Sequence, residues 1–183
     1  TGNPFFSVLL SISNHPPYVI PPYFHPHSDV LEEQIVEYAD WSIRQFMQAA
    51  EKQPWFDNTI FVFLGDHGKM VGTPECEMPQ SYNHIPLMIY GKDIKPGVYD
   101  GFGGQVDVSP TLLGLLNISY LQNNFGVNLL EEERPCMFFT ADNLIGARDS
   151  VNMFIYSPDS QQEFKYKLEE GKLHAATGTD EEA

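Results

Sequence analysis

An unbroken apolar run that ends in an acid and a histidine between two glycines places the strongest constraint on the fold. The run is Ile60–Leu64, within the sequence NTIFVFLGDHG (58–68). β-Branched and aromatic residues without polar interruption are typical of a parallel strand that is buried on both faces. The glycines allow the backbone to turn directly after the strand. Because open α/β sheets bind ligands at the carboxyl ends of their strands, Asp66 and His67 are expected at the rim of a cleft.

Asp66 and His67 are candidate metal ligands. A carboxylate oxygen and a neutral imidazole nitrogen suit borderline divalent ions such as zinc and manganese. On the dipeptide alone, a helix N-cap followed by a turn histidine is the more common arrangement. The metal interpretation therefore depends on the wider pattern of the chain.

Composition narrows the class of protein. The chain has 183 residues, of which 42% are hydrophobic, as expected for a globular domain with a core. Ten basic and 25 acidic residues give a formal charge of -15, which repels nucleic acid, so no nucleic-acid partner is expected. No apolar run is long enough to span a bilayer. Cys76 and Cys136 lack the CxxC spacing of a zinc knuckle.

The chain opens with a second apolar run, PFFSVLLSIS (4–13), which predicts another central parallel strand. His15 follows it directly, as His67 follows Ile60–Leu64, so both histidines are expected at the same edge of the sheet. A histidine before two prolines is more often a loop-packing residue. The proline-rich passage through His27 excludes both helix and central strand.

Two segments have the pattern of helices. Apolar residues recur every three or four positions over 29–53, which indicates an amphipathic crossover helix. The sequence QVDVSPTLLGLLN (105–117) predicts a second helix, capped by Asp107 or Ser109; Asp107 is expected to be a cap rather than a ligand. Between them, His84 precedes a strand-like run (85–90) and lies 17 positions beyond His67, after a long irregular loop. Its default interpretation is a structural hydrogen-bonding residue.

The C-terminal part has a different sequence pattern. Short strand candidates separated by turn residues predict an antiparallel meander. They are 136–140, 143–148, 151–156 and 163–168. The sequence as a whole predicts an α/β fold, a three-layer sandwich with a largely parallel central sheet plus this small antiparallel sheet. Residues 1–134 are assigned to the α/β body, 135–176 to an antiparallel β subdomain of the same domain, and 177–183 to a disordered tail.

Four segments occur together in a characteristic order. They are Pro4–Pro17 (strand, then SNHPP), Tyr38–Gly68 (YADWSI, then NTIFVFLGDHG), His84–Tyr90 (HIPLMIY) and Gly104–Leu116 (GQVDVSPTLLGLL). With this set the chain resembles the sulfatase and alkaline phosphatase superfamily, and within it the lipoteichoic acid synthase branch of phosphoglycerol transferases. Phosphoethanolamine transferases and sulfatases are somewhat further off. The resemblance spans roughly residues 4–130.

The resemblance implies a role for each matching residue. Asp66 and His67 match the paired ligands of one divalent metal ion, which would be Mn, Zn or Mg, or Ca in a sulfatase. His15 matches a histidine that contacts the phosphoryl or sulfuryl group of an anionic ester substrate. His84 lies where some branches have an active-site histidine. The reaction implied is phosphoglycerol or phosphoethanolamine transfer from a phospholipid head group through a covalent phospho-threonine; sulfate-ester hydrolysis is the alternative.

The resemblance also implies that two catalytic elements of the family lie outside this sequence. In the family, the nucleophile and a further acidic ligand precede the segment that matches here. The chain is therefore expected to be the C-terminal half of a catalytic domain, inactive alone and partnered by the missing N-terminal half. The parent is expected to be extracytoplasmic and anchored by N-terminal transmembrane helices. Two other readings remain: a non-catalytic α/β module, and a different metallohydrolase, for which too few ligands are placed.

Overall fold

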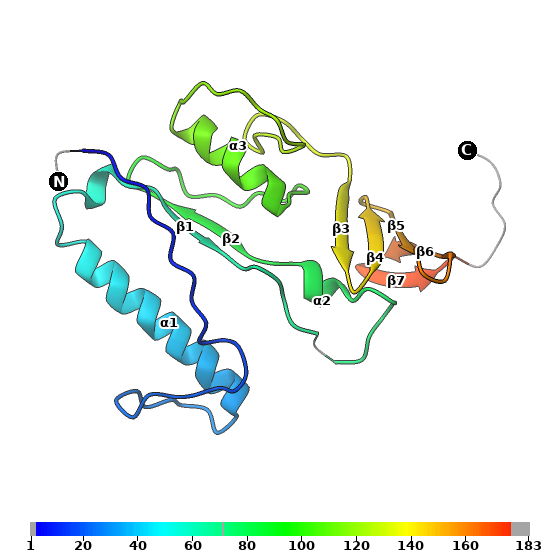
Figure 1. Cartoon of the computed structure of the whole chain (residues 1–183), viewed down its shortest axis with the longest axis horizontal. Helices are drawn as coiled ribbons and strands as arrows, with labels where there is room; N and C mark the ends of the chain where they lie inside the picture. Colours follow the sequence, from blue (N-terminus) through cyan, green and yellow to red (C-terminus); the bar gives the residue numbers. More distant parts are fainter. Residues whose placement is uncertain (1–2, 71, 177–183) are drawn as a thin grey trace. The chain divides into compact units, whose positions relative to one another are not determined.

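The computed structural model describes residues 3–70 and 72–176, and its elements are labelled along the chain in Figure 1. The chain divides into two compact units. One comprises Thr1–Phe61 and Tyr90–Asp93, and the other comprises Val62–Ile89 and Ile94–Ala183. Within the described residues, no helix is long and apolar enough to cross a membrane. The predicted disordered tail, 177–183, lies outside the described residues.

The first unit is built on helix α1 (Leu31–Ala50), which confirms the helix predicted from the apolar period. Its carboxylate Glu37 accepts hydrogen bonds from the backbone N–H groups of His27 (2.7 Å) and Ser28 (3.0 Å). These bonds, the one from His27 foremost, lower the pKa of Glu37. They attach the end of the proline-rich passage to the helix. The short 3₁₀ helix η1 (Phe56–Asn58) follows α1.

The predicted strand over residues 4–13 does not form. Both faces of this segment are exposed: Phe6, Leu9, Leu10 and Ile12 are each 80% exposed or more. Phe5 makes an edge-to-face contact with Trp55, with ring centroids 5.6 Å apart. A parallel strand needs neighbours that bond its N–H and C=O groups, and no strand of the described residues pairs with this segment. The apolar run alone could not supply those neighbours.

One short strand precedes residues 65–68, which contain Asp66 and His67, and a second short strand follows them along the chain. Strand β1 (Phe61–Leu64) and strand β2 (Leu87–Tyr90) form a two-stranded sheet. Between them lies the single-turn helix α2 (Gln80–Asn83), and after them comes helix α3 (Gln105–Leu115). Strand β1 becomes more exposed along its length, from the buried Phe61 to the exposed Leu64. It is therefore less deeply buried than its composition predicts.

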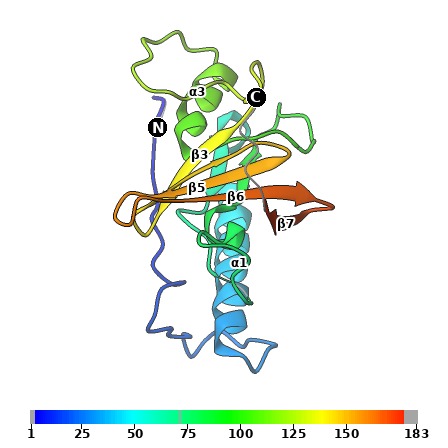
Figure 2. The same ribbon diagram turned by 90° about the vertical axis from the view of Figure 1, so that its right-hand side faces the viewer.

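The C-terminal segment forms a five-stranded antiparallel meander, as predicted, with one additional strand (Figure 2). The strands are β3 (Met137–Ala141), β4 (Leu144–Arg148), β5 (Asn152–Ser157), β6 (Gln162–Glu169) and β7 (Lys172–Ala175). Asp142 and Asn143 join β3 to β4 with φ of 48° and 62°, and Glu170 and Gly171 join β6 to β7 with φ of 50° and 78°. Two positive φ values are the mark of type I′ hairpin turns, which suit the twist of the flanking strands.

The core of the second unit lies on one face of this meander. Met153 and Ile155 alternate along β5 and are 1% and 0% exposed, and Met78, from the loop that follows β1, packs with them at 1%. Alternate residues of β6, including Phe164 and Tyr166, cover the cluster. The period of two along both strands places these side chains on the same face. A residue from the loop that follows β1 is thus built into the core of the C-terminal sheet.

The predicted largely parallel central sheet is not present in residues 3–70 and 72–176. The strands there form only the two-stranded sheet and the antiparallel meander. The fold is therefore mixed α/β, with antiparallel pairing in its larger sheet. The physical reason is the same as for residues 4–13, since strand-like composition becomes a central sheet only where further strands supply hydrogen bonds on both sides.

Candidate active site

The candidate site is the turn that ends β1, residues 65–68. The N–H of Gly65 donates to the carbonyl of Pro86 (3.3 Å) next to β2, which holds the start of the turn to the two-stranded sheet. Immediately after it, the side chains of Asp66 and His67 are 78% and 58% exposed. Both functional groups are consequently open to a ligand from solvent.

Hydrogen bonds orient the imidazole of His67. Its Nδ1 lies 2.7 Å from the carbonyl oxygen of Gly68. Because a carbonyl oxygen only accepts, Nδ1 carries the proton, and in the neutral imidazole Nε2 then keeps a free lone pair. The backbone N–H of His67 also donates to Asp66 Oδ1 (2.9 Å), which holds that carboxylate over the turn. A histidine that donates through one ring nitrogen and presents the other is the usual form of a metal-ligating imidazole.

The free donor atoms of the two residues lie close together. Asp66 Oδ2 and His67 Nε2 are 3.9 Å apart. Oxygen and nitrogen ligands bind zinc at about 2.0–2.2 Å, so two of them at the tetrahedral angle lie about 3.4 Å apart. The observed separation is longer than this spacing by about 0.5 Å, and the donor chemistry suits a divalent ion. The two residues supply two ligands; nowhere in the described part of the chain do three or more His, Cys, Asp or Glu side chains form a group that could hold a metal.

Two residues from other elements support the turn. The side-chain amide of Gln105, at the start of α3, donates to the carbonyls of Gly65 (3.2 Å) and Asp66 (2.7 Å). Tyr82 of α2 contacts the other end of the turn, where its carbonyl accepts from the N–H of Gly68 (2.7 Å). Neither contact could be inferred from the sequence, because both join segments that are distant along the chain.

The other two predicted site residues lie elsewhere. His84 is exposed and ends α2, where its N–H donates to the carbonyl of Gln80 (2.8 Å). It belongs to the same unit as Asp66 and His67 but forms no metal-binding group with them. His15 is exposed in the first unit, and its Nδ1 lies 2.7 Å from the carbonyl oxygen of Pro16. The roles of both histidines stay predictions.

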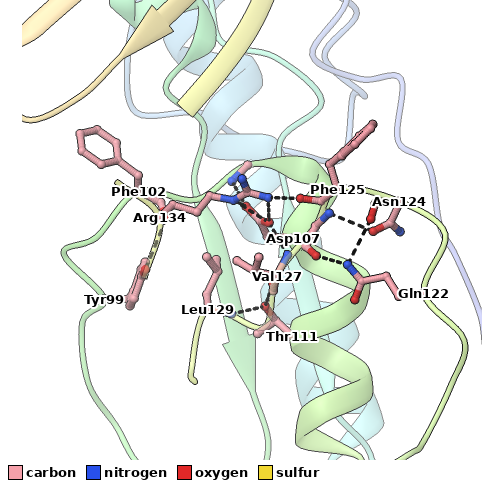
Figure 3. Close-up of polar contacts among 12 residues, drawn as sticks. Tyr99, Phe102, Asp107, Thr111, Gln122, Asn124, Phe125, Val127, Leu129 and Arg134 are labelled. Atoms are coloured by element: carbon pink, nitrogen blue, oxygen red, sulfur yellow. Dashed lines mark hydrogen bonds and ion pairs between the residues drawn. The ribbon is translucent and has the colours of Figure 1, made fainter. Parts of the chain in front are cut away.

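A buried ion pair fixes the start of α3, the helix that carries Gln105 (Figure 3). The Asp107 carboxylate is fully buried and accepts bonds from Arg134 Nε (2.8 Å) and Nη2 (2.6 Å). It also accepts from the N–H groups of Gly104 and Val127, both at 2.8 Å. Asp107 therefore caps α3 as expected, but from the third position of the helix, because the N-cap residue is Gly104 and neither Asp107 nor Ser109. Its partner Arg134, in an acidic run, gave no comparable sequence signal.

The environment of Asp107 favours its charged form. Burial alone raises the pKa of this carboxyl group, but the hydrogen bonds from Arg134, Val127 and Gly104 and the charge of Arg134 together lower it below its usual range. The guanidinium also donates to the carbonyl of Phe125. One buried charge therefore holds three segments together, namely the start of α3, the loop near residue 126 and the segment that leads into β3.

Comparisons with known proteins identify the family to which the chain is similar. Residues 1–118 match the Sulfatase family model. The chain is 25% identical to lipoteichoic acid synthase 1 of Bacillus subtilis (strain 168) over 93% of its own length and 30% of the relative's. It is 29% identical to choline-sulfatase of Rhizobium meliloti (strain 1021), over 58% of this chain and 22% of that enzyme.

A solved structure is similar over most of the chain. It is a protein in the alkaline phosphatase superfamily from Vibrio parahaemolyticus, with a TM-score of 0.78 and 25% identity. The match covers 90% of this chain and 42% of that protein. The chain thus spans less than a third of these two curated relatives and less than half of the solved structure.

Proposed function

Since the chain belongs to the sulfatase family, we propose that it is part of the catalytic domain of a metal-dependent enzyme that transfers or hydrolyses phosphate or sulfate esters. The observation that carries the proposal is the pair of free donors, Asp66 Oδ2 and His67 Nε2, 3.9 Å apart on an exposed turn. The similarity to lipoteichoic acid synthases favours transfer of a phosphoglycerol or phosphoethanolamine group. The similarity to choline-sulfatase supports sulfate-ester hydrolysis as the second candidate.

In this proposal Asp66 and His67 hold one divalent cation, Mn, Zn or Mg for a transferase and Ca for a sulfatase. Such an ion, when bound, offsets the negative charge on the oxygens of an anionic ester. Asp66 contributes a charged oxygen, and His67 contributes Nε2 while the bond from Nδ1 to Gly68 keeps the ring in the competent tautomer. His15 and His84 are assigned to the substrate, where an imidazole can donate to a nonbridging oxygen or protonate the leaving oxygen.

The proposal assigns the nucleophile to another part of the full protein. A phospho-threonine route requires a threonine beside the metal, and the chain spans 30% of lipoteichoic acid synthase 1. The remaining ligands belong there too, because two ligands bind a cation more weakly than four. Alone, the chain is then inactive. An extracytoplasmic location with an N-terminal membrane anchor belongs to the same proposal.

The test uses the full-length protein with Asp66→Asn and His67→Gln. Metal content by elemental analysis and turnover of phosphatidylglycerol, phosphatidylethanolamine and an aryl sulfate are measured together. We expect both variants to lose metal and turnover, because each removes a ligand. Asp100→Asn and His174→Gln, at exposed positions in the same unit, are the matched controls. Wild-type metal content and turnover in either ligand variant would refute the assignment.

A further inference from the structure

The imidazole of His67 is covered on one face by an aromatic ring. The rings of His67 and Tyr82 are stacked, with centroids 5.2 Å apart and an angle of 20° between their planes. His67 is otherwise an exposed residue with polar contacts to its neighbours Asp66 and Gly68. An exposed histidine with only local contacts would exchange between rotamers on the picosecond to nanosecond timescale. Contact with the flat face of Tyr82 restricts that exchange.

The backbone beneath this stack is tightly packed. The N–H of Gly68 donates to the carbonyl of Tyr82, and a Cβ atom on Gly68 would collide with the carbonyl oxygen of Ser81. Residue 68 must therefore be glycine for the turn to approach α2 this closely. This close approach places the ring of Tyr82 against the ring of His67, because His67 directly precedes Gly68 and Tyr82 supplies the carbonyl that Gly68 bonds.

Helix α2 itself is held by the C-terminal sheet. A helix of one turn has no stability of its own, so its position depends on tertiary contacts. Met78 lies two residues before it and is buried in the core of the meander. Gln80 accepts a hydrogen bond from Arg148 of β4, and Glu77 accepts one from the hydroxyl of Tyr166 on β6. Three contacts thus join the residues around the start of α2 to the sheet.

We propose that Tyr82 is a positioning residue that keeps His67 Nε2 directed at Asp66, and that the C-terminal sheet fixes Tyr82 through Met78. This inference rests on the proposed function, because it concerns His67 as a metal ligand. In this proposal the antiparallel sheet helps to orient a metal ligand, because it holds the segment that carries Tyr82. Restricting the ring before the ion arrives reduces the entropy lost on binding, so Tyr82 contributes to metal affinity without touching the metal.

The experiment compares Tyr82→Phe and Tyr82→Ala in the full chain. Histidine is labelled with ¹³C and ¹⁵N, and the ring resonances of His67 are assigned with His67→Gln. Spectra are recorded without metal, above the ordinary histidine pKa of about 6.5. We expect Tyr82→Phe to keep the ring-current shift of His67, and Tyr82→Ala to abolish it. Titration with Mn²⁺ is expected to show about tenfold weaker binding for Tyr82→Ala and wild-type binding for Tyr82→Phe.

Two further variants keep the test decisive. Tyr120→Ala removes a tyrosine of the same unit whose hydroxyl bonds Gln122, and it should leave His67 unchanged. Tyr82→Leu fills part of the ring's volume if the alanine variant fails to fold. An unchanged His67 shift in both Tyr82→Ala and Tyr82→Leu would overturn the inference. The titration is made in the full-length protein, which supplies the remaining ligands; if that protein binds no Mn²⁺, the metal assignment fails, and the ring shift alone decides whether Tyr82 positions His67.

Discussion

Replacing Arg134 by methionine should destabilise the second unit strongly at neutral pH. The change removes three hydrogen bonds to the buried Asp107 carboxylate and the one to Phe125. Removing one partner of a buried ion pair costs about 3–5 kcal/mol. Because the N–H groups of Gly104 and Val127 still bond the carboxylate, we expect the lower end, about 3 kcal/mol. Methionine keeps much of the apolar stem of arginine, so the loss reports chiefly on the charge.

The loss should also depend on pH in a defined direction. The folded-state pKa of Asp107 lies below its unfolded value of about 3.9. Its ionised form therefore stabilises the fold above that value, and the contribution disappears as the pH falls through the folded pKa. The difference between wild type and Arg134→Met should be full near neutral pH and should shrink below about pH 4.

Urea denaturation followed by circular dichroism, at neutral pH and at about pH 3, measures both effects. Arg44→Met is the matched control, because Arg44 pairs with Asp40 at 3.2 Å on the surface of α1. That exposed pair should contribute less than about 0.5 kcal/mol. A loss below about 1 kcal/mol for Arg134→Met, or one that persists undiminished in acid, would refute the reasoning.

Three other predictions concern the loop that joins the site to the sheet. Met78→Ala should lower the free energy of unfolding, measured by urea denaturation, by about 2–5 kcal/mol, and should weaken the ring-current shift of His67. Met70→Ala, on the exposed part of the same loop, should change neither quantity. Gly68→Ala should lower metal content in the full-length protein because its Cβ collides with α2; Gly97→Ala, in open space, is the control. Burial raises the pKa of the Cys76 thiol, so alkylation at neutral pH, followed by mass spectrometry, should be slower than in the denatured chain; equal rates would contradict this.

Much of the fold could be predicted where the pattern is local. The apolar period of α1, the presence of a helix within 105–117 and the alternation along β5 and β6 all follow from residues close together in sequence. Strand β7 was missed because its sequence, KLHA, offers Leu173 as its only aliphatic residue larger than alanine. The run at 4–13 has strand composition, yet no strand pairs with it in the described residues.

The candidate site was predictable only in part, for a related reason. Asp66 and His67 follow a recognisable strand, so their position could be inferred directly. Tyr82 and Gln105 could not, because their contacts depend on how a long irregular loop and a distant helix return to the turn. Arg134 is likewise separated from Asp107 by 27 positions. Residues that support a site are harder to recognise than those that form it.

The meander has a consequence for the order of folding. Every pair of neighbouring strands in it is also adjacent along the chain, with connecting loops of two to four residues. Such low contact order favours rapid assembly, and single hairpins close in about 1–10 μs. Docking of Met78 is a long-range event by comparison, since it requires the finished surface of β5. We therefore expect the turn at residues 65–68 to become ordered only after the meander has folded.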